Sequence, residues 1–114
     1  MSEIGQIYRV EIEFEDKPNE SKFRPVLIYN DKDELGLYPI VEITSVPPND
    51  PPKFHDGFKE PINKWLESGL EKPSYVKIHK ITRVEESAFV SFYGNMDIED
   101  LDKVLVKIVE LHSS

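Results

Sequence analysis

The chain has 114 residues and no cysteine, and its 22 acidic residues outnumber its 14 basic ones, which gives a formal net charge of −8 at pH 7. The length allows one domain with its own core, residues 1–114, while the missing cysteines exclude thiol catalysis, disulfides and zinc sites with cysteine ligands. The acidic balance argues against a nucleic-acid binder, and because we find no membrane-spanning run and no signal-peptide pattern, we expect a soluble, cytoplasmic protein.

The first part of the chain predicts three strands. Residues 8–15 alternate between apolar and polar side chains, which is typical of a half-buried strand. We expect a polar connection over 16–22 and then a more buried strand over 24–29, with a proline at its start. Residues 37–45 form the third predicted strand, in which Glu42 is expected to be exposed.

A stiff, proline-rich loop is expected over residues 46–59, followed by a short helix near 61–68. Gly69 suits the position just after such a helix, and Leu70 is then placed to pack back on Trp65. The pair His55 and Asp56 makes a poor metal site, because no third ligand lies nearby in the sequence. The aromatic residues of this region are expected in the core under the loop, although one that is exposed could stack on a base: Phe54, Phe58 and Trp65.

The last part of the chain predicts two strands and one helix. Residues 75–84 and 88–93 read as strands, and residues 97–111 carry an apolar stripe at helical spacing with Asp97 as the N-cap. The predicted class is therefore mainly β with a C-terminal helix. We expect a small β-barrel of five or more strands, or a strongly bent sheet, plus the short helix near 61–68.

One short segment is basic on this acidic chain. Between residues 72 and 84 there is no acidic residue, and the cations are Lys72, Lys77, Lys80 and Arg83, with His79 among them. The alternation places Lys77 and His79 on one face of the strand and then breaks at Lys80, which is compatible with a β-bulge. Two interpretations of this segment remain open: an ordinary solvated face, and a surface that binds along a phosphate backbone.

Four ordered segments resemble the PemK/MazF toxin family, the ribonuclease arm of type II toxin–antitoxin modules. They are Gly5-Gln6-Ile7-Tyr8, Arg24-Pro25-Val26-Leu27-Ile28, Ile43-Thr44-Ser45, and the run Gly69 to Val76 that precedes Gly94-Asn95-Met96-Asp97 and the last helix. The resemblance covers almost the whole chain. It implies an SH3-like barrel related to CcdB, a homodimer, and cleavage of single-stranded RNA with neither metal nor cofactor. It also implies a cognate antitoxin protein as partner.

Metal-free RNA cleavage uses the 2′-hydroxyl as the nucleophile and needs a group that stabilises the phosphorane. The resemblance makes Arg24 and Thr44 the candidate catalytic residues, with Arg24 as an electrostatic stabiliser because a guanidinium is a poor general base. Ser45 offers a second hydroxyl, and Thr44-Ser45 is equally compatible with an ordinary strand end. His79 has the better pKa for proton transfer, and with Lys77 and Lys80 it is expected to bind substrate.

Two other functions stay open. The acidic charge favours a protein-binding module that kept the fold and lost catalysis. A gyrase inhibitor of the CcdB type ranks last, because that family uses an aromatic residue near the end of its last helix and this chain ends Glu-Leu-His-Ser-Ser.

Overall fold

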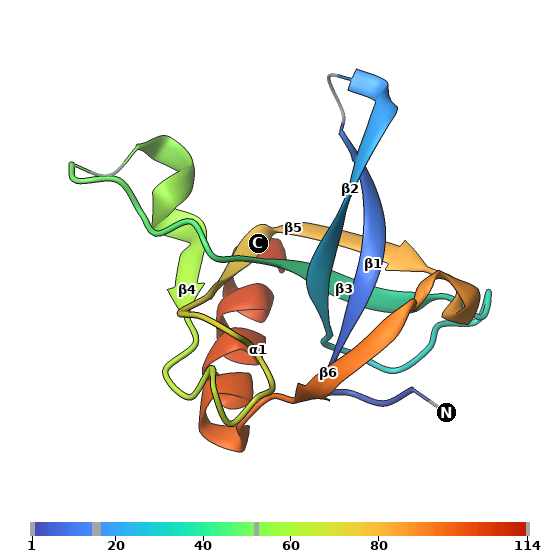
Figure 1. Cartoon of the computed structure of the whole chain (residues 1–114). Helices are drawn as coiled ribbons and strands as arrows, with labels where there is room; N and C mark the ends of the chain where they lie inside the picture. Colours follow the sequence, from blue (N-terminus) through green and yellow to red (C-terminus); the bar gives the residue numbers. More distant parts are fainter. Residues whose placement is uncertain (1, 15–16, 52, 114) are drawn as a thin grey trace.

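The computed structural model describes residues 2–14, 17–51 and 53–113. In chain order its elements are β1 (Gln6–Phe14), β2 (Lys17–Ile28), β3 (Tyr38–Thr44), the 3-10 helix η1 (Phe54–Phe58), β4 (Lys59–Pro61), β5 (Tyr75–Val84), the 3-10 helix η2 (Glu86–Ala88), β6 (Ser91–Asn95) and α1 (Ile98–His112). The predicted class, mainly β with a C-terminal helix, is confirmed (Figure 1).

The six strands form one antiparallel sheet in the order β4-β5-β3-β2-β1-β6. β1 and β2 make a long hairpin, which stands out from the rest of the sheet in Figure 1. The sheet is twisted and is not closed, since β4 and β6 lie at opposite ends of the strand order. The expected barrel is thus an open, bent sheet.

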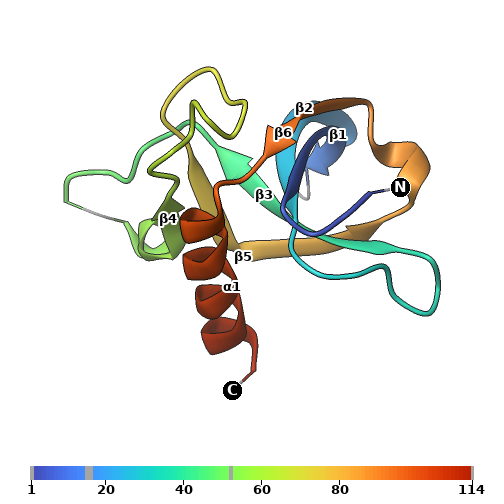
Figure 2. The same cartoon turned by 90° about the horizontal axis from the view of Figure 1, so that it is seen from below.

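The core lies on both sides of this sheet, because alternate residues of each strand point to opposite faces. The larger cluster joins strand residues such as Leu27, Val41 and Val76 to the helix residues Leu101 and Val104. The smaller cluster contains Val10, Val26, Ile28, Tyr38 and Ile40. Figure 2 shows α1 beside β4 and β5, so the helix covers the larger cluster at that end of the sheet.

The helix α1 forms as the sequence predicts. The Asp97 carboxylate accepts a hydrogen bond from the Glu99 N–H at 3.0 Å, which caps the first turn. At the other end, the His112 ring is 2.9 Å from the Ile78 carbonyl oxygen, through its Nε2, and this contact ties the helix to β5. Within the described residues, no helix combines the length and the apolar character that crossing a bilayer requires.

Two predicted boundaries are wrong, and one strand is missing from the prediction. The expected connection at 16–22 is largely strand, because β2 begins at Lys17 and its backbone pairs with β1 at Lys17 opposite Phe14 and from Ser21 opposite Glu13 onwards. The last strand begins at Ser91, since η2 occupies the start of the range predicted for it. The sequence analysis also missed β4, whose three residues pair with the start of β5.

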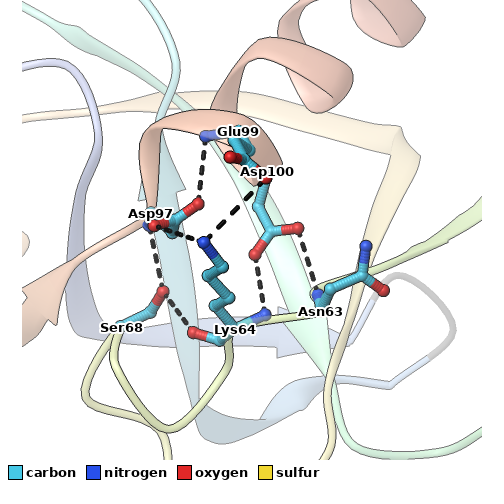
Figure 3. A network of polar contacts seen from close by, with 6 residues as sticks. All are labelled: Asn63, Lys64, Ser68, Asp97, Glu99 and Asp100. Carbon is cyan, nitrogen blue, oxygen red and sulfur yellow. Dashed lines mark hydrogen bonds and ion pairs between the residues drawn. The ribbon is translucent and has the colours of Figure 1, made fainter.

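Hydrogen-bonded turns over residues 63–69 replace the short helix expected near 61–68. The backbone N–H groups of Asn63 and Lys64 are bound by the Asp100 carboxylate at 3.1 and 2.8 Å (Figure 3). The predicted helix ending is nevertheless present: the Leu70 N–H reaches the Trp65 carbonyl and the Gly69 N–H reaches the Leu66 carbonyl. This pair of bonds is a Schellman motif, and Gly69 adopts the positive φ of 90° that it needs.

Candidate functional site

A pocket of about 180 Å³ lies where the Arg24 end of β2, the last residues of β3 and the segment after Gly69 come together. Its polar lining is Arg24, Thr44, Ser45, Glu71, Lys72 and Ser74, and its apolar lining is Pro25, Ile43, Leu70 and Tyr93. The structure therefore brings the predicted residues Arg24, Thr44 and Ser45 together, although they come from different strands.

Thr44 is held in place by the turn that ends β3. Its Oγ1 accepts a hydrogen bond from the Val46 N–H at 3.1 Å, and only 5% of the residue is exposed. A hydroxyl that accepts one bond still carries its own proton, so Thr44 can donate into the pocket. Ser45 follows at the exposed end of the strand. Thr44 can therefore stabilise the turn after β3 and also donate a hydrogen bond to a ligand in the pocket.

Arg24 shares a carboxylate with Lys77. Glu42 Oε1 lies 3.9 Å from Arg24 Nε and 3.7 Å from Lys77 Nζ. The Glu42 side chain is 15% exposed, so the expectation that Glu42 is exposed is wrong: its neighbours on β2 and β5 supply the charges that allow it to be buried. Two cations and one acid leave a net positive charge of one beside the pocket.

The bulge expected in β5 is present. Val41 pairs with Ile81 and Ile43 pairs with Val76, so four residues of β5 lie opposite Glu42 alone. This bulged segment is Lys77 to Lys80, and it contains three of the predicted substrate-binding residues. The bulge brings Lys77 to Glu42 at the place where β3 carries its carboxylate.

The structure does not bring His79 or Lys80 into the pocket. The His79 ring packs against Phe58, with 5.1 Å between ring centroids, and both residues belong to the region of η1 and β5. Neither His79 nor Lys80 lines the pocket that contains Arg24. The pocket instead receives Lys72, the first cation of the basic segment.

Sequence reasoning missed Glu71 and Ser74 as pocket residues and Glu42 as a contact of Arg24. The Ser74 hydroxyl donates to the Lys72 carbonyl at 2.8 Å, which shapes the chain beside the pocket. Glu71 and Ser74 lie within the run Gly69 to Val76 that carried the family resemblance, so that run was the available signal. For Glu42 the strand pattern predicted an exposed side chain, which is the opposite of what the structure shows.

The loop that follows Ser45 is fixed by Asp56. Its carboxylate accepts hydrogen bonds from the Lys53 N–H at 2.8 Å and from the side chain and N–H of Asn49 at 2.8 and 2.9 Å, and it pairs with Lys59 at 3.1 Å. These bonds, that of Lys53 first, hold the pKa of Asp56 well below its ordinary value. The expectation that Phe54 is core is wrong, since it is 80% exposed.

No group of three or more histidine, aspartate or glutamate side chains suited to a metal ion is found among the residues that the structure describes. The side chain of His55, the other member of the pair with Asp56, lies outside the described residues.

The comparison with protein families gives one match over almost the whole chain. Residues 3–112 match the model described as PemK-like, MazF-like toxin of type II toxin–antitoxin system. A search of the curated proteins gives no significant match.

Solved structures share the fold at low sequence identity. An endoribonuclease in complex with its cognate antitoxin, from a mycobacterial species, superposes with a TM-score of 0.72 at 14% identity, over 96% of this chain and 93% of that chain. The Mycobacterium tuberculosis toxin MazF-mt6 gives a TM-score of 0.63 at 18% identity, over 93% of both chains. A MazE–MazF structure from Deinococcus radiodurans gives 0.70 at 14%, over 98% of this chain and 96% of that chain.

Proposed function

The chain belongs to the family of PemK-like, MazF-like toxins of type II toxin–antitoxin systems, and we propose on this basis that it is a metal-independent endoribonuclease of single-stranded RNA. The observation that carries the proposal is the shared pocket of Arg24, Thr44 and Ser45. An invariably charged guanidinium beside two hydroxyl groups matches the needs of a phosphate that gains negative charge during cleavage. A solved structure with the same fold is named an endoribonuclease, which supports this choice.

The proposed reaction forms a bond between the 2′-oxygen and phosphorus and breaks the bond from phosphorus to the 5′-oxygen. Arg24 stabilises the phosphorane, and the Thr44 and Ser45 hydroxyls donate to its non-bridging oxygens. Glu71 lines the same pocket, and its carboxylate can accept the proton of the 2′-hydroxyl. Lys72 lines it as well, and its ammonium can give a proton to the leaving 5′-oxygen. The products are a cyclic phosphate and a free 5′-hydroxyl.

Lys77, His79 and Lys80 keep the role of substrate-binding residues in this proposal, outside the pocket. Lys77 is the nearest of the three to the catalytic group, because it shares Glu42 with Arg24. The bulged segment of β5 then offers a path for the phosphates next to the cleaved one. His79 has no assigned proton transfer in this scheme, since it packs on Phe58.

The test is cleavage of a long single-stranded RNA by the purified protein in the presence of EDTA, with the new ends mapped. We expect discrete cuts that leave cyclic phosphate ends, and no cuts with Arg24→Ala. Arg83→Ala is the matched control, because Arg83 is an ion-paired arginine on β5 that does not line the pocket. Intact RNA with folded wild-type protein contradicts the proposal, and wild-type rates with Arg24→Ala contradict the role of Arg24.

The proposal includes a cognate antitoxin protein and a homodimer as the assembly. Two of the structures with the same fold are complexes with an antitoxin or with MazE. An acidic antitoxin segment that covers Arg24 and Lys77 would block the pocket by charge complementarity. Co-expression of the neighbouring gene product and light scattering of the toxin alone test these two parts separately.

A second candidate function is protein binding without catalysis. The net charge of −8 favours it, because an acidic body lowers affinity for RNA and attracts a basic partner. If the protein shows no RNA binding at low salt, where electrostatic affinity is greatest, protein binding is favoured over the ribonuclease.

A further inference from the structure

An arginine and a phenylalanine are stacked on the surface of the β1–β2 hairpin. The guanidinium carbon of Arg9 lies 4.4 Å from the centre of the Phe23 ring. Phe23 is 46% exposed and Arg9 is exposed as well, although large apolar side chains are usually buried when the fold allows it. A guanidinium and an aromatic ring are both flat, and both stack on nucleobases.

Neither residue of this pair lines the pocket that contains Arg24, but the strand register places the pair beside it. Arg9 pairs with Pro25 in the β1–β2 register, and Pro25 lines the pocket. Phe23 lies two residues before Pro25, so the two point to the same face of β2. On the other side Arg9 pairs with Ser91 of β6, and Tyr93 of the same strand also lines the pocket. The hairpin that carries the pair is the upright one in Figure 1.

The pocket alone holds only part of a nucleotide. Its volume of about 180 Å³ is below the range of about 300–1,000 Å³ that is usual for small-molecule sites. A phosphate with its sugar suits this space, so the bases on either side must find contacts outside it. Arg9 and Phe23 are exposed and have flat side-chain groups, and the strand register places them next to the pocket wall.

We propose that Arg9 and Phe23 form a stacking platform for one unpaired base of single-stranded RNA, next to the phosphate that Arg24 contacts. The inference rests on the proposed function, because it assumes RNA as the ligand of the pocket. Stacking accepts every base, so the platform supplies affinity and places the strand, while it gives little discrimination between bases. The preference for unpaired RNA follows, since a base inside a duplex has no free face.

The test measures binding by fluorescence anisotropy of a short, mixed-sequence RNA with 2′-O-methyl groups, which the protein cannot cut by 2′-attack. We expect Phe23→Ala to weaken binding by about 5- to 150-fold and Phe23→Trp to restore it. The slope of log Kd against log salt should stay unchanged with Phe23→Ala, because no phosphate contact is lost, and it should fall by about 1 with Arg24→Ala. Phe54→Ala is the matched control, because Phe54 is an exposed phenylalanine on η1 and not on the β1–β2 hairpin beside the pocket.

The outcomes separate this inference from the ribonuclease itself. Wild-type affinity with Phe23→Ala, or an equal loss with Phe54→Ala, overturns the platform while cleavage by the wild type stands. RNA binding that depends on Phe23, without any cleavage, keeps the platform and removes the ribonuclease. Absence of RNA binding by the folded wild type at low salt overturns both. Thermal unfolding of each variant verifies that it is folded.

Discussion

Glu42 and Arg24 lie on adjacent strands with 3.9 Å between the carboxylate Oε1 and the guanidinium Nε. The carboxylate also contacts Lys77, so it holds two cations toward one place beside the pocket. A substrate phosphate has the same charge sign as Glu42 and seeks the same two donors. In the proposed reaction, the acid therefore fixes the position of Arg24 and competes with the RNA phosphate for it.

We expect Glu42→Gln to lower both KM and kcat for RNA cleavage. The missing charge leaves the two cations unneutralised, which tightens substrate binding and lowers KM. Arg24 is then less well oriented toward the phosphorane, and kcat should fall by about 3- to 10-fold, as suits a partly exposed ion pair. Steady-state kinetics on a short RNA that contains one cut site measures both constants.

Asp33→Asn is the matched control for this variant. Asp33 forms an ion pair with Arg83 at 3.1 Å, and neither residue lines the pocket. Its kinetic constants should equal those of the wild type. An unchanged kcat with Glu42→Gln, or a higher KM, contradicts the positioning role.

Gly69 is expected to tolerate no side chain. Its φ is 90°, and a Cβ there would collide with the Tyr93 carbonyl oxygen of β6. We expect Gly69→Ala to destabilise the protein by about 3 kcal/mol or more, because backbone strain adds to the collision. Since Leu70, Glu71 and Lys72 line the pocket directly after this glycine, any variant that folds should also cut RNA poorly. Urea unfolding and the cleavage assay measure the two effects.

Two other glycines separate the causes. Gly36 also has a positive φ, of 80°, but open space around it, so Gly36→Ala should cost about 1 kcal/mol from backbone strain alone. Gly57 has open space as well and is not among the glycines with positive φ, so Gly57→Ala should be close to neutral. Equal losses at Gly36 and Gly69 would show that the contact with Tyr93 contributes nothing.

Asp100 joins the turn over residues 63–69 to the start of α1. It is 2% exposed, and its carboxylate accepts the N–H groups of Asn63 and Lys64 (Figure 3). We expect Asp100→Ala to lower the free energy of unfolding by about 2–4 kcal/mol, because two backbone donors lose their acceptor. Thermal or urea unfolding measures the loss.

Glu99→Ala is the companion variant, since Glu99 is 73% exposed and contacts Lys64 at 3.9 Å in the same network. Its loss should stay below about 0.5 kcal/mol. A loss for Asp100→Ala as small as that of Glu99→Ala would mean that the turn satisfies its N–H groups by other means.

The sequence predicts the elements whose pattern comes from their own residues. β5 has the predicted bounds because Val76 and Ile78 alternate with charged residues, and α1 follows its N-cap and its apolar stripe. Thr44 and Ser45, which the resemblance places in the site, line one pocket together with Arg24. In each of these cases local chemistry and tertiary contacts agree.

Two of the failures share one cause, which is a partner far away in the chain. The turns after Ile62 are tied to Asp100, which accepts the N–H groups of Asn63 and Lys64, and no local pattern reveals an acceptor 36 residues later. Glu42 is mostly buried because Arg24 and Lys77 approach it from two other strands. The third failure is local: residues 19–22 of β2 are exposed and polar, so their side-chain pattern carries no strand signal, although Ser21 and Lys22 pair with β1.

The stability of the loop after Ser45 should depend on pH in the acid range, because the Asp56 carboxylate holds this loop. Its pKa is lowered in the folded state, mainly by the N–H of Lys53 and by Asn49, so the charged form is favoured by folding. The stabilisation is fully present above the unfolded pKa of about 3.9; it declines at lower pH and is gone below the folded pKa.

The amides of Asn49 and Lys53 should therefore be protected from hydrogen exchange at pH 5 to 7, and Asp56→Asn should remove part of that protection. Asp33→Asn, which changes a carboxylate bound to Leu35 and Leu37, should leave both amides as in the wild type. If the Asp56→Asn amides exchange as slowly as those of the wild type, the carboxylate does not hold this loop.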